Sequence, residues 1–60
     1  MITKFQLLMA FANRTPLTIN GVHFMHLNVI EHEDGSSHSF NLRGIDDHGR
    51  YWTVHIRTVD

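Results

Sequence analysis

The chain contains no cysteine, a single proline and almost no net charge. Without cysteine, disulfide frameworks, redox-active thiols and Cys-based zinc sites are all excluded. The formal charge of -1 with neutral histidines argues against a protein that grips phosphate backbones, where a clearly basic face is expected. Because near-zero charge favours association, self-assembly is the more natural expectation.

Long apolar runs are also missing, since none reaches the roughly 18 residues that a membrane-spanning helix needs. The N-terminal stretch as far as Ala12 imitates a signal peptide. However, Gln6 interrupts the stretch, which is also shorter than the usual ~15 to 30 residues. Absence of cysteine suits a reducing compartment. We therefore expect a cytoplasmic protein that makes no membrane contact.

Sixty residues allow one domain, spanning residues 1–60. A chain of this size buries only about 60% of its unfolded surface, so its stability is marginal without an additional stabilising feature. With disulfides excluded, a second subunit is the leading candidate for that feature, and a histidine metal site is the next. A homodimer is therefore expected.

The N-terminal residues carry a complete helix-start pattern. Thr3 and Gln6 have the spacing of a capping box, and Ile2 and Leu7 fall at the two hydrophobic-staple positions that flank it. The single proline ends the segment, because the residue before proline is pushed out of the α region. The pattern predicts a helix over about residues 4–12.

This helix is apolar almost all the way round. Its main stripe, at helical spacing, consists of Phe5, Leu8, Met9 and Ala12. Leu7 and Phe11 form a second, offset stripe, and one sheet cannot cover both stripes. We therefore expect Leu7 and Phe11 to contact a partner.

The rest of the chain has the pattern of strands separated by turns. Asn20-Gly21 and Asp34-Gly35 are two-residue type I′ turn signals, and Asp47-His48-Gly49 fits a three-residue loop with glycine in the left-handed position. The predicted strands are about 17–19, 22–33, 36–46 and 50–59. The expected fold is α+β, with one N-terminal helix packed on a four-stranded antiparallel β-meander.

Counting back from each turn sets the strand pairing. The first turn opposes Ile19 with Val22, and the last opposes Gly44 with Trp52. The middle turn opposes Met25 with Gly44, Leu27 with Leu42, and Val29 with Phe40. The period of two along a strand then assigns a core face beneath the helix. This face holds Met25, Leu27, Val29, Phe40, Leu42, Trp52, Val54 and Ile56.

The opposite face is predicted to be apolar at one end and polar in its middle. The apolar end consists of Leu17, Ile19, Val22, Phe24, Ile45 and Tyr51. The polar middle consists of His26, Asn28, Asn41, Arg43, Thr53, His55 and Arg57. Because a one-layer sheet should be apolar on one side only, the apolar end is assigned, with Leu7 and Phe11, to a partner or dimer interface.

The histidines do not predict a metal site. His23 and His26 point to opposite faces of a strand, and His26 and His55 lie on non-adjacent strands with Arg43 between them. A zinc site needs three or four ligands, and no third ligand is apparent. We expect neither a metal nor another cofactor.

Catalytic constellations are equally weak. Glu31 with His38, and Asp46-Asp47-His48, place an acid near an imidazole, and Ser36 supplies a hydroxyl. A sheet with one short helix leaves little volume for a pocket around them, and Ser36 is typical of turn chemistry. An enzyme is not expected.

The leading functional hypothesis is a small non-enzymatic protein–protein interaction module, a homodimer that modulates or inhibits a larger macromolecule. By analogy, chains of this kind are often encoded by phages and mobile elements. The alternative is a nucleic-acid-binding protein, or one that meets another polar partner, through the polar face. That alternative would use His26, Asn41, Arg43, His55 and Arg57.

Overall fold

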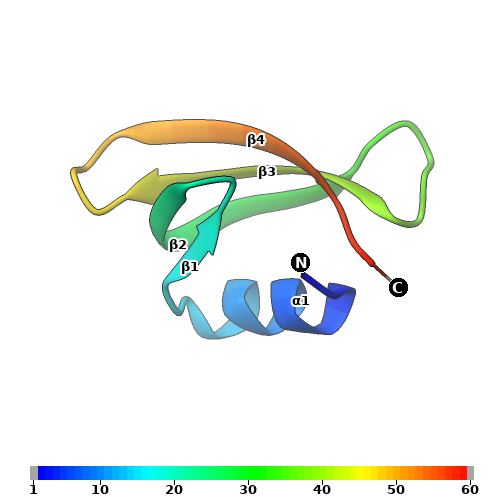
Figure 1. The fold of residues 1–60 in the computed structure, drawn as a ribbon, viewed down its shortest axis with the longest axis horizontal. Helices are drawn as coiled ribbons and strands as arrows, with labels where there is room; N and C mark the ends of the chain where they lie inside the picture. Colours follow the sequence, from blue (N-terminus) through cyan, green and yellow to red (C-terminus); the bar gives the residue numbers. More distant parts are fainter. Residues whose placement is uncertain (1, 60) are drawn as a thin grey trace.

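The computed structural model describes residues 2–59 (Figure 1). Its elements are α1 (Lys4–Asn13), β1 (Leu17–Ile19), β2 (Val22–His32), β3 (Ser39–Asp46) and β4 (Tyr51–Arg57). The four strands form one antiparallel sheet in the order β1-β2-β3-β4, with α1 against one face. The predicted α+β meander is confirmed.

Helix α1 begins as predicted. The Thr3 hydroxyl accepts a hydrogen bond from the Gln6 backbone N–H at 3.1 Å, and the Gln6 side chain accepts one from the Thr3 N–H at 2.9 Å. The helix ends at Asn13, one residue beyond the predicted end, and Arg14 caps it in the left-handed conformation. The capping box therefore holds the first turn of α1 without tertiary contacts.

The orientation of α1 corrects the sequence prediction. Leu7 and Ala10 are the helix residues that face the sheet, whereas the stripe expected to do so points to solvent. Ile2 packs against the same core as Leu7, as the staple pattern requires. The Ile2 carbonyl also accepts a hydrogen bond from the Val59 N–H at 3.1 Å, which ties this end of α1 to the C-terminal segment. The small Ala10 side chain lets the helix approach the sheet closely.

Both terminal hairpins have the predicted register. β1 opposes Ile19 with Val22 across the Asn20-Gly21 turn, in which both turn residues have positive φ. β3 opposes Gly44 with Trp52, and Gly49 closes the three-residue loop with a φ of 81°. These pairings are local in sequence, and each turn type determines its register.

The pairing of β2 with β3 differs from the prediction. The turn at Asp34-Gly35 forms, but β3 resumes only at Ser39, because the Ser36 hydroxyl accepts hydrogen bonds from the N–H groups of His38 and Ser39. The connection is therefore a longer loop instead of a two-residue turn. The observed partners across it are His32 with Phe40, Ile30 with Leu42, and Leu27 with Gly44.

Two β-bulges in β2 change which residues face the helix. Met25 and Asn28 are the extra residues, lying where the register shifts between Phe24 and His26 and between Leu27 and Val29. Phe24, Leu27 and Ile30 consequently turn inward at a spacing of three. The buried apolar core consists of Leu7, Ile19, Phe24, Leu27, Phe40 and Leu42.

The bulges also explain two of the three errors in the predicted core face, those at Met25 and Val29, whereas Trp52 lies on β4, whose register with β3 has no bulge. Leu27, Phe40 and Leu42 are buried as expected, with Val54 and Ile56 packed beside them. Met25 and Trp52 are exposed instead, and Val29 lies opposite Arg43 on the other face. Each inserted residue reverses the parity of the strand, so a strict period of two fails in β2.

Candidate functional site

The face of the sheet opposite α1, called here the outer face, is polar. The register places His26 beside Ile45, Asn41 beside His55 and Arg43 beside Thr53. Asn28 joins them by donating a hydrogen bond from Nδ2 to the Tyr51 hydroxyl at 2.7 Å. The seven predicted polar residues therefore share one face. They are His26, Asn28, Asn41, Arg43, Thr53, His55 and Arg57.

Acidic side chains offset the positive charge of the outer face. Glu31 lies 4.0 Å from the Arg43 guanidinium, and Glu33 lies 3.7 Å from Nδ1 of His55. All four side chains are substantially exposed, so these pairs stabilise the fold little. Their main effect is on the local potential, because two acids stand among the groups that would contact phosphate.

Four of the six residues of the apolar end predicted for the outer face are not on that face. Ile19 and Phe24 are buried in the core, and Leu17 and Val22 pack against it. The bulge at Met25 turns the β1–β2 hairpin over, so its apolar side chains join the helix side of the sheet. Within the predicted interface set, Ile45 and Tyr51 remain on the outer face. Leu7 is also removed from that set, because it is fully buried within its own chain.

Four of the eight exposed large apolar side chains among residues 2–59 lie together on α1. This helix stripe consists of Phe5 at 71% exposure, Leu8 at 49%, Met9 at 43% and Phe11 at 36%. Of the two helix residues predicted to meet a partner, Phe11 stays available and Leu7 does not. The staple position of Leu7 was the signal in the sequence that could have identified it as a core residue. Apolar patches of this kind mark interaction sites in proteins.

Asp46 holds the loop between β3 and β4. The residue is 6% exposed, and its carboxylate accepts hydrogen bonds from the backbone N–H groups of Arg50 at 2.8 Å and His48 at 2.9 Å, and from Nε1 of Trp52 at 2.7 Å. The Arg50 hydrogen bond, followed by that of Trp52, lowers the pKa of Asp46 below its ordinary value. Burial opposes this effect but does not outweigh it. The carboxylate is thus a structural group that joins the loop to the edge strand.

The lowered pKa predicts how stability depends on pH. A carboxyl group whose folded pKa lies below its unfolded pKa stabilises the fold above the unfolded value, about 3.9, and loses this contribution as pH falls through the folded pKa. Asp46→Asn is expected to lower the Tm at pH 7, because an amide nitrogen would face one of the three N–H donors. In this variant the Tm should also fall less steeply than in the parent chain as the pH is lowered. Thermal melts of both proteins between pH 7 and 2 measure this.

Asp47→Asn provides the matched control, because Asp47 is exposed and its carboxylate lies 3.6 Å from the equally exposed imidazole of the neighbouring His48. The Tm of this variant should follow the parent chain across the pH range. An equally shallow fall of the Tm in the Asp46 and Asp47 variants would contradict the role given to Asp46.

The remaining candidate constellations do not form a site in the described part of the chain. Glu31 pairs with Asn41 and not with His38, and the Ser36 hydroxyl closes the turn. Among residues 2–59, no three side chains from His, Cys, Asp or Glu come together to hold a metal ion. No helix among these residues is long and apolar enough to cross a membrane. No family model matches the chain, and neither a curated protein nor a solved structure is significantly similar to it.

Proposed function

We propose that the protein is a small non-enzymatic interaction module that forms a homodimer through α1 and modulates or inhibits a larger macromolecule. The observation that carries this proposal is the helix stripe, which consists of four large apolar side chains on the exposed face of α1. A cytoplasmic location and an origin in a phage or mobile element belong to the same proposal.

The helix stripe supports association for a physical reason. Burying a leucine or phenylalanine side chain is worth about 1.5–3 kcal/mol, and a two-fold interface buries each residue twice. Helix α1 is also well suited to present these side chains. Its first turn is capped, its opposite side is anchored by Leu7 and Ala10, and its exposed residues are already ordered.

Self-association is tested with Leu8→Gln combined with Phe11→Gln. Light scattering at micromolar concentration should give a dimer mass for the parent chain and a monomer mass for the variant. We expect the dissociation constant to rise about 100-fold or more, since at least 3 kcal/mol of burial is lost. Circular dichroism should show that the fold is retained.

Met25→Gln is the matched control, because it removes an exposed apolar side chain from the β2 bulge and leaves α1 unchanged. Its mass should equal that of the parent chain. A parent chain that stays monomeric at these concentrations would contradict dimerisation through the helix stripe.

The outer face supports a second candidate, nucleic-acid binding, because Arg43, Arg57 and two histidines lie together with Asn41. The nearby Glu31 and Glu33 weaken this candidate, since they reduce the positive potential. A monomer whose binding to nucleic acid depends strongly on salt, and is lost on combining Arg43→Ala with Arg57→Ala, would favour it over the first proposal.

A further inference from the structure

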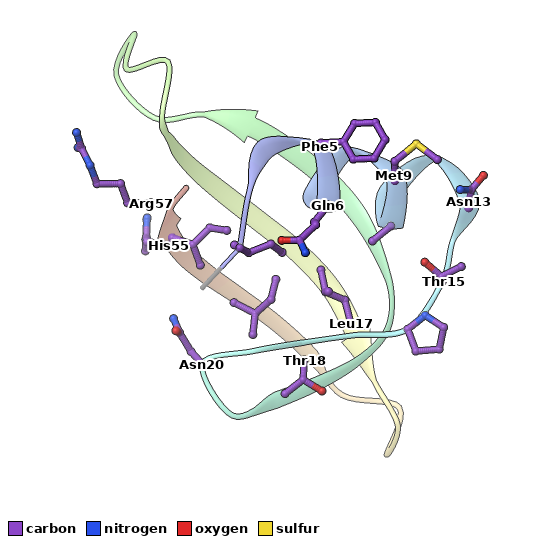
Figure 2. A pocket seen from close by; sticks show the side chains of 15 residues that line it. Phe5, Gln6, Met9, Asn13, Thr15, Leu17, Thr18, Asn20, His55 and Arg57 are labelled. Carbon is purple, nitrogen blue, oxygen red and sulfur yellow. The ribbon is translucent and has the colours of Figure 1, made fainter. Parts of the chain in front are cut away.

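A groove with a volume of about 930 Å³ separates α1 from the two edge strands of the sheet. Figure 2 shows its walls: Phe5 and Met9 on α1, Leu17 and Thr18 on β1, and His55 and Arg57 on β4. Leu8 and Phe11 do not line it, so the groove shares only Phe5 and Met9 with the helix stripe. Its volume lies within the range of ligand sites, about 300–1,000 Å³.

Both open edges of the sheet border this groove. β1 and β4 are the first and last strands in the sheet order, so one side of each has no strand partner among the described residues. The Asp46 N–H donates a hydrogen bond to the Arg50 carbonyl, so these two residues are a hydrogen-bonded pair of the β3–β4 ladder. By the alternation of an antiparallel ladder, the N–H and C=O groups of His55 and Arg57 point away from β3.

The same argument applies to β1, on the opposite wall. In a two-residue hairpin, Ile19 and Val22 next to the turn form a hydrogen-bonded pair, so Thr18 directs its backbone groups away from β2. Thr18, His55 and Arg57 all line the groove. Backbone donors and acceptors without a strand partner therefore lie on two walls of the groove. An added strand requires such groups, whereas a compact apolar ligand does not use them.

The edge of β4 lacks the features that usually prevent strand addition. Between Tyr51 and Arg57 there is no proline and no lysine, and the register with β3 is continuous without a bulge. Side chains from an added strand would alternate between the outer face and the groove. The groove offers them an apolar surface formed by Ile2, Phe5, Met9, Leu17, Ile19 and Ile56.

The charge of the groove selects among extended peptides. None of the described residues that line it is acidic, whereas Arg57 and His55 border it along β4, with side chains that the register places on the outer face. Glu33 contacts His55 at 3.7 Å, which leaves Arg57 as the stronger cation for a ligand. We propose that the groove binds an extended peptide of another protein as a fifth strand along β4, with alternate apolar side chains in the groove and a carboxylate at Arg57.

A display library of random peptides, selected on the parent chain, tests this proposal. The selected peptides should alternate apolar and polar residues and carry an aspartate or glutamate at one end. Selection on Arg57→Glu should replace the acid with lysine or arginine. No enrichment, enrichment of amphipathic helical peptides, or an unchanged charge preference would overturn the proposal.

Amide hydrogen exchange with a selected peptide tests the binding mode without any substitution. The N–H groups of His55 and Arg57 should exchange more slowly with the peptide bound, because they gain strand partners. Val54 and Ile56, which already face β3, should change little. A bound peptide that leaves His55 and Arg57 unprotected would overturn strand addition.

His55→Pro and His55→Ala form a matched pair. Proline is tolerated on the open edge of a sheet, and here it removes one backbone N–H donor without disturbing the hydrogen bonds to β3. It should weaken the affinity for the selected peptide about tenfold or more. Alanine keeps the backbone N–H and should retain the affinity within a few-fold. Equal weakening by both variants would contradict backbone pairing. If the proline variant does not fold, the exchange measurement on the parent chain decides.

This inference goes beyond the proposed dimer and fails separately from it. Leu8→Gln with Phe11→Gln should abolish the dimer and leave peptide affinity unchanged. A dimer that itself protects the His55 and Arg57 amides, without peptide, would show a second copy in the groove and overturn the peptide as its occupant. A monomer that still selects acidic extended peptides would overturn the dimer alone.

Discussion

Replacing Leu7 with alanine is expected to lower the free energy of unfolding by about 2–5 kcal/mol, the range for large-to-small changes at fully buried leucines. Leu7 is 0% exposed and is the only large side chain by which the regular part of α1 enters the buried core. The rest of the buried core consists of phenylalanine, leucine and isoleucine side chains from three strands, which have little freedom to collapse into the space. A domain of sixty residues has a total stability of roughly 3–9 kcal/mol, so much of it would be lost.

Leu8→Ala supplies the control, because it removes the same atoms from the next residue of the same helix. Leu8 is 49% exposed, and alanine favours helix slightly more than leucine does, so we expect a loss below about 1 kcal/mol. Urea denaturation at a concentration where the chain is monomeric compares the two variants. A larger effect at Leu8 would mean that α1 is rotated by about 100°, with the opposite stripe on the sheet.

Gly44→Ala is expected to destabilise the fold by about 3 kcal/mol, at the upper end of the range for overpacked cores. A Cβ atom at this position would lie 2.5 Å from the His26 carbonyl oxygen, 2.9 Å from Cδ1 of Phe24 and 3.1 Å from Cα of Leu27. Two of these atoms belong to the backbone of β2, which cannot move aside by a change of rotamer. This close approach of β2 to β3 lies beside the bulge between Phe24 and His26, a usual place for a strand glycine.

Gly21→Ala separates this steric effect from loss of backbone freedom. A Cβ at Gly21 would meet nothing within 4 Å, but its φ of 79° places alanine in the left-handed region, at a cost of about 1–2 kcal/mol. Gly44 has no such conformation, so its larger expected loss comes from contact alone. Urea denaturation of the two variants gives the order. A Gly44 variant as stable as the parent chain would contradict the packing of β2 against β3.

The local elements of this fold were predictable, and the long-range pairing was not. Thr3 with Gln6, and Asn20-Gly21, determine a helix start and a hairpin through contacts between near neighbours. The β2–β3 register depends instead on the Ser36 hydroxyl, which extends a turn that Asp34-Gly35 alone would have closed. In this loop a serine hydroxyl accepts the backbone hydrogen bonds that a partner strand would otherwise accept. The alternation of apolar and polar residues along a strand does not predict such a hydrogen bond.

The candidate site follows the same division. The polar outer face was predicted because Asn41, Arg43 and His55 belong to the local β3–β4 hairpin, whose register is correct. The apolar partner surface was misplaced because one bulge turned Phe24 and its hairpin inward. The spacing of three between Phe24, Leu27 and Ile30 was a visible sign of the bulges. The groove depends on how close the edge strands β1 and β4 come to α1 and to each other. The pairing of neighbouring strands, which the turns predict, does not determine this distance.

The two bulges have a geometric consequence for the whole sheet. β2 uses two more residues than β3 over their paired stretch, which adds roughly 7 Å of contour to one strand beside a shorter neighbour. Strands of unequal length can stay paired only if the longer one follows an arc, so Met25 and Asn28 impose curvature on the sheet (Figure 1). That curvature brings the outermost strands to a common hollow. Met25 and Asn28 therefore shape a groove that neither of them lines.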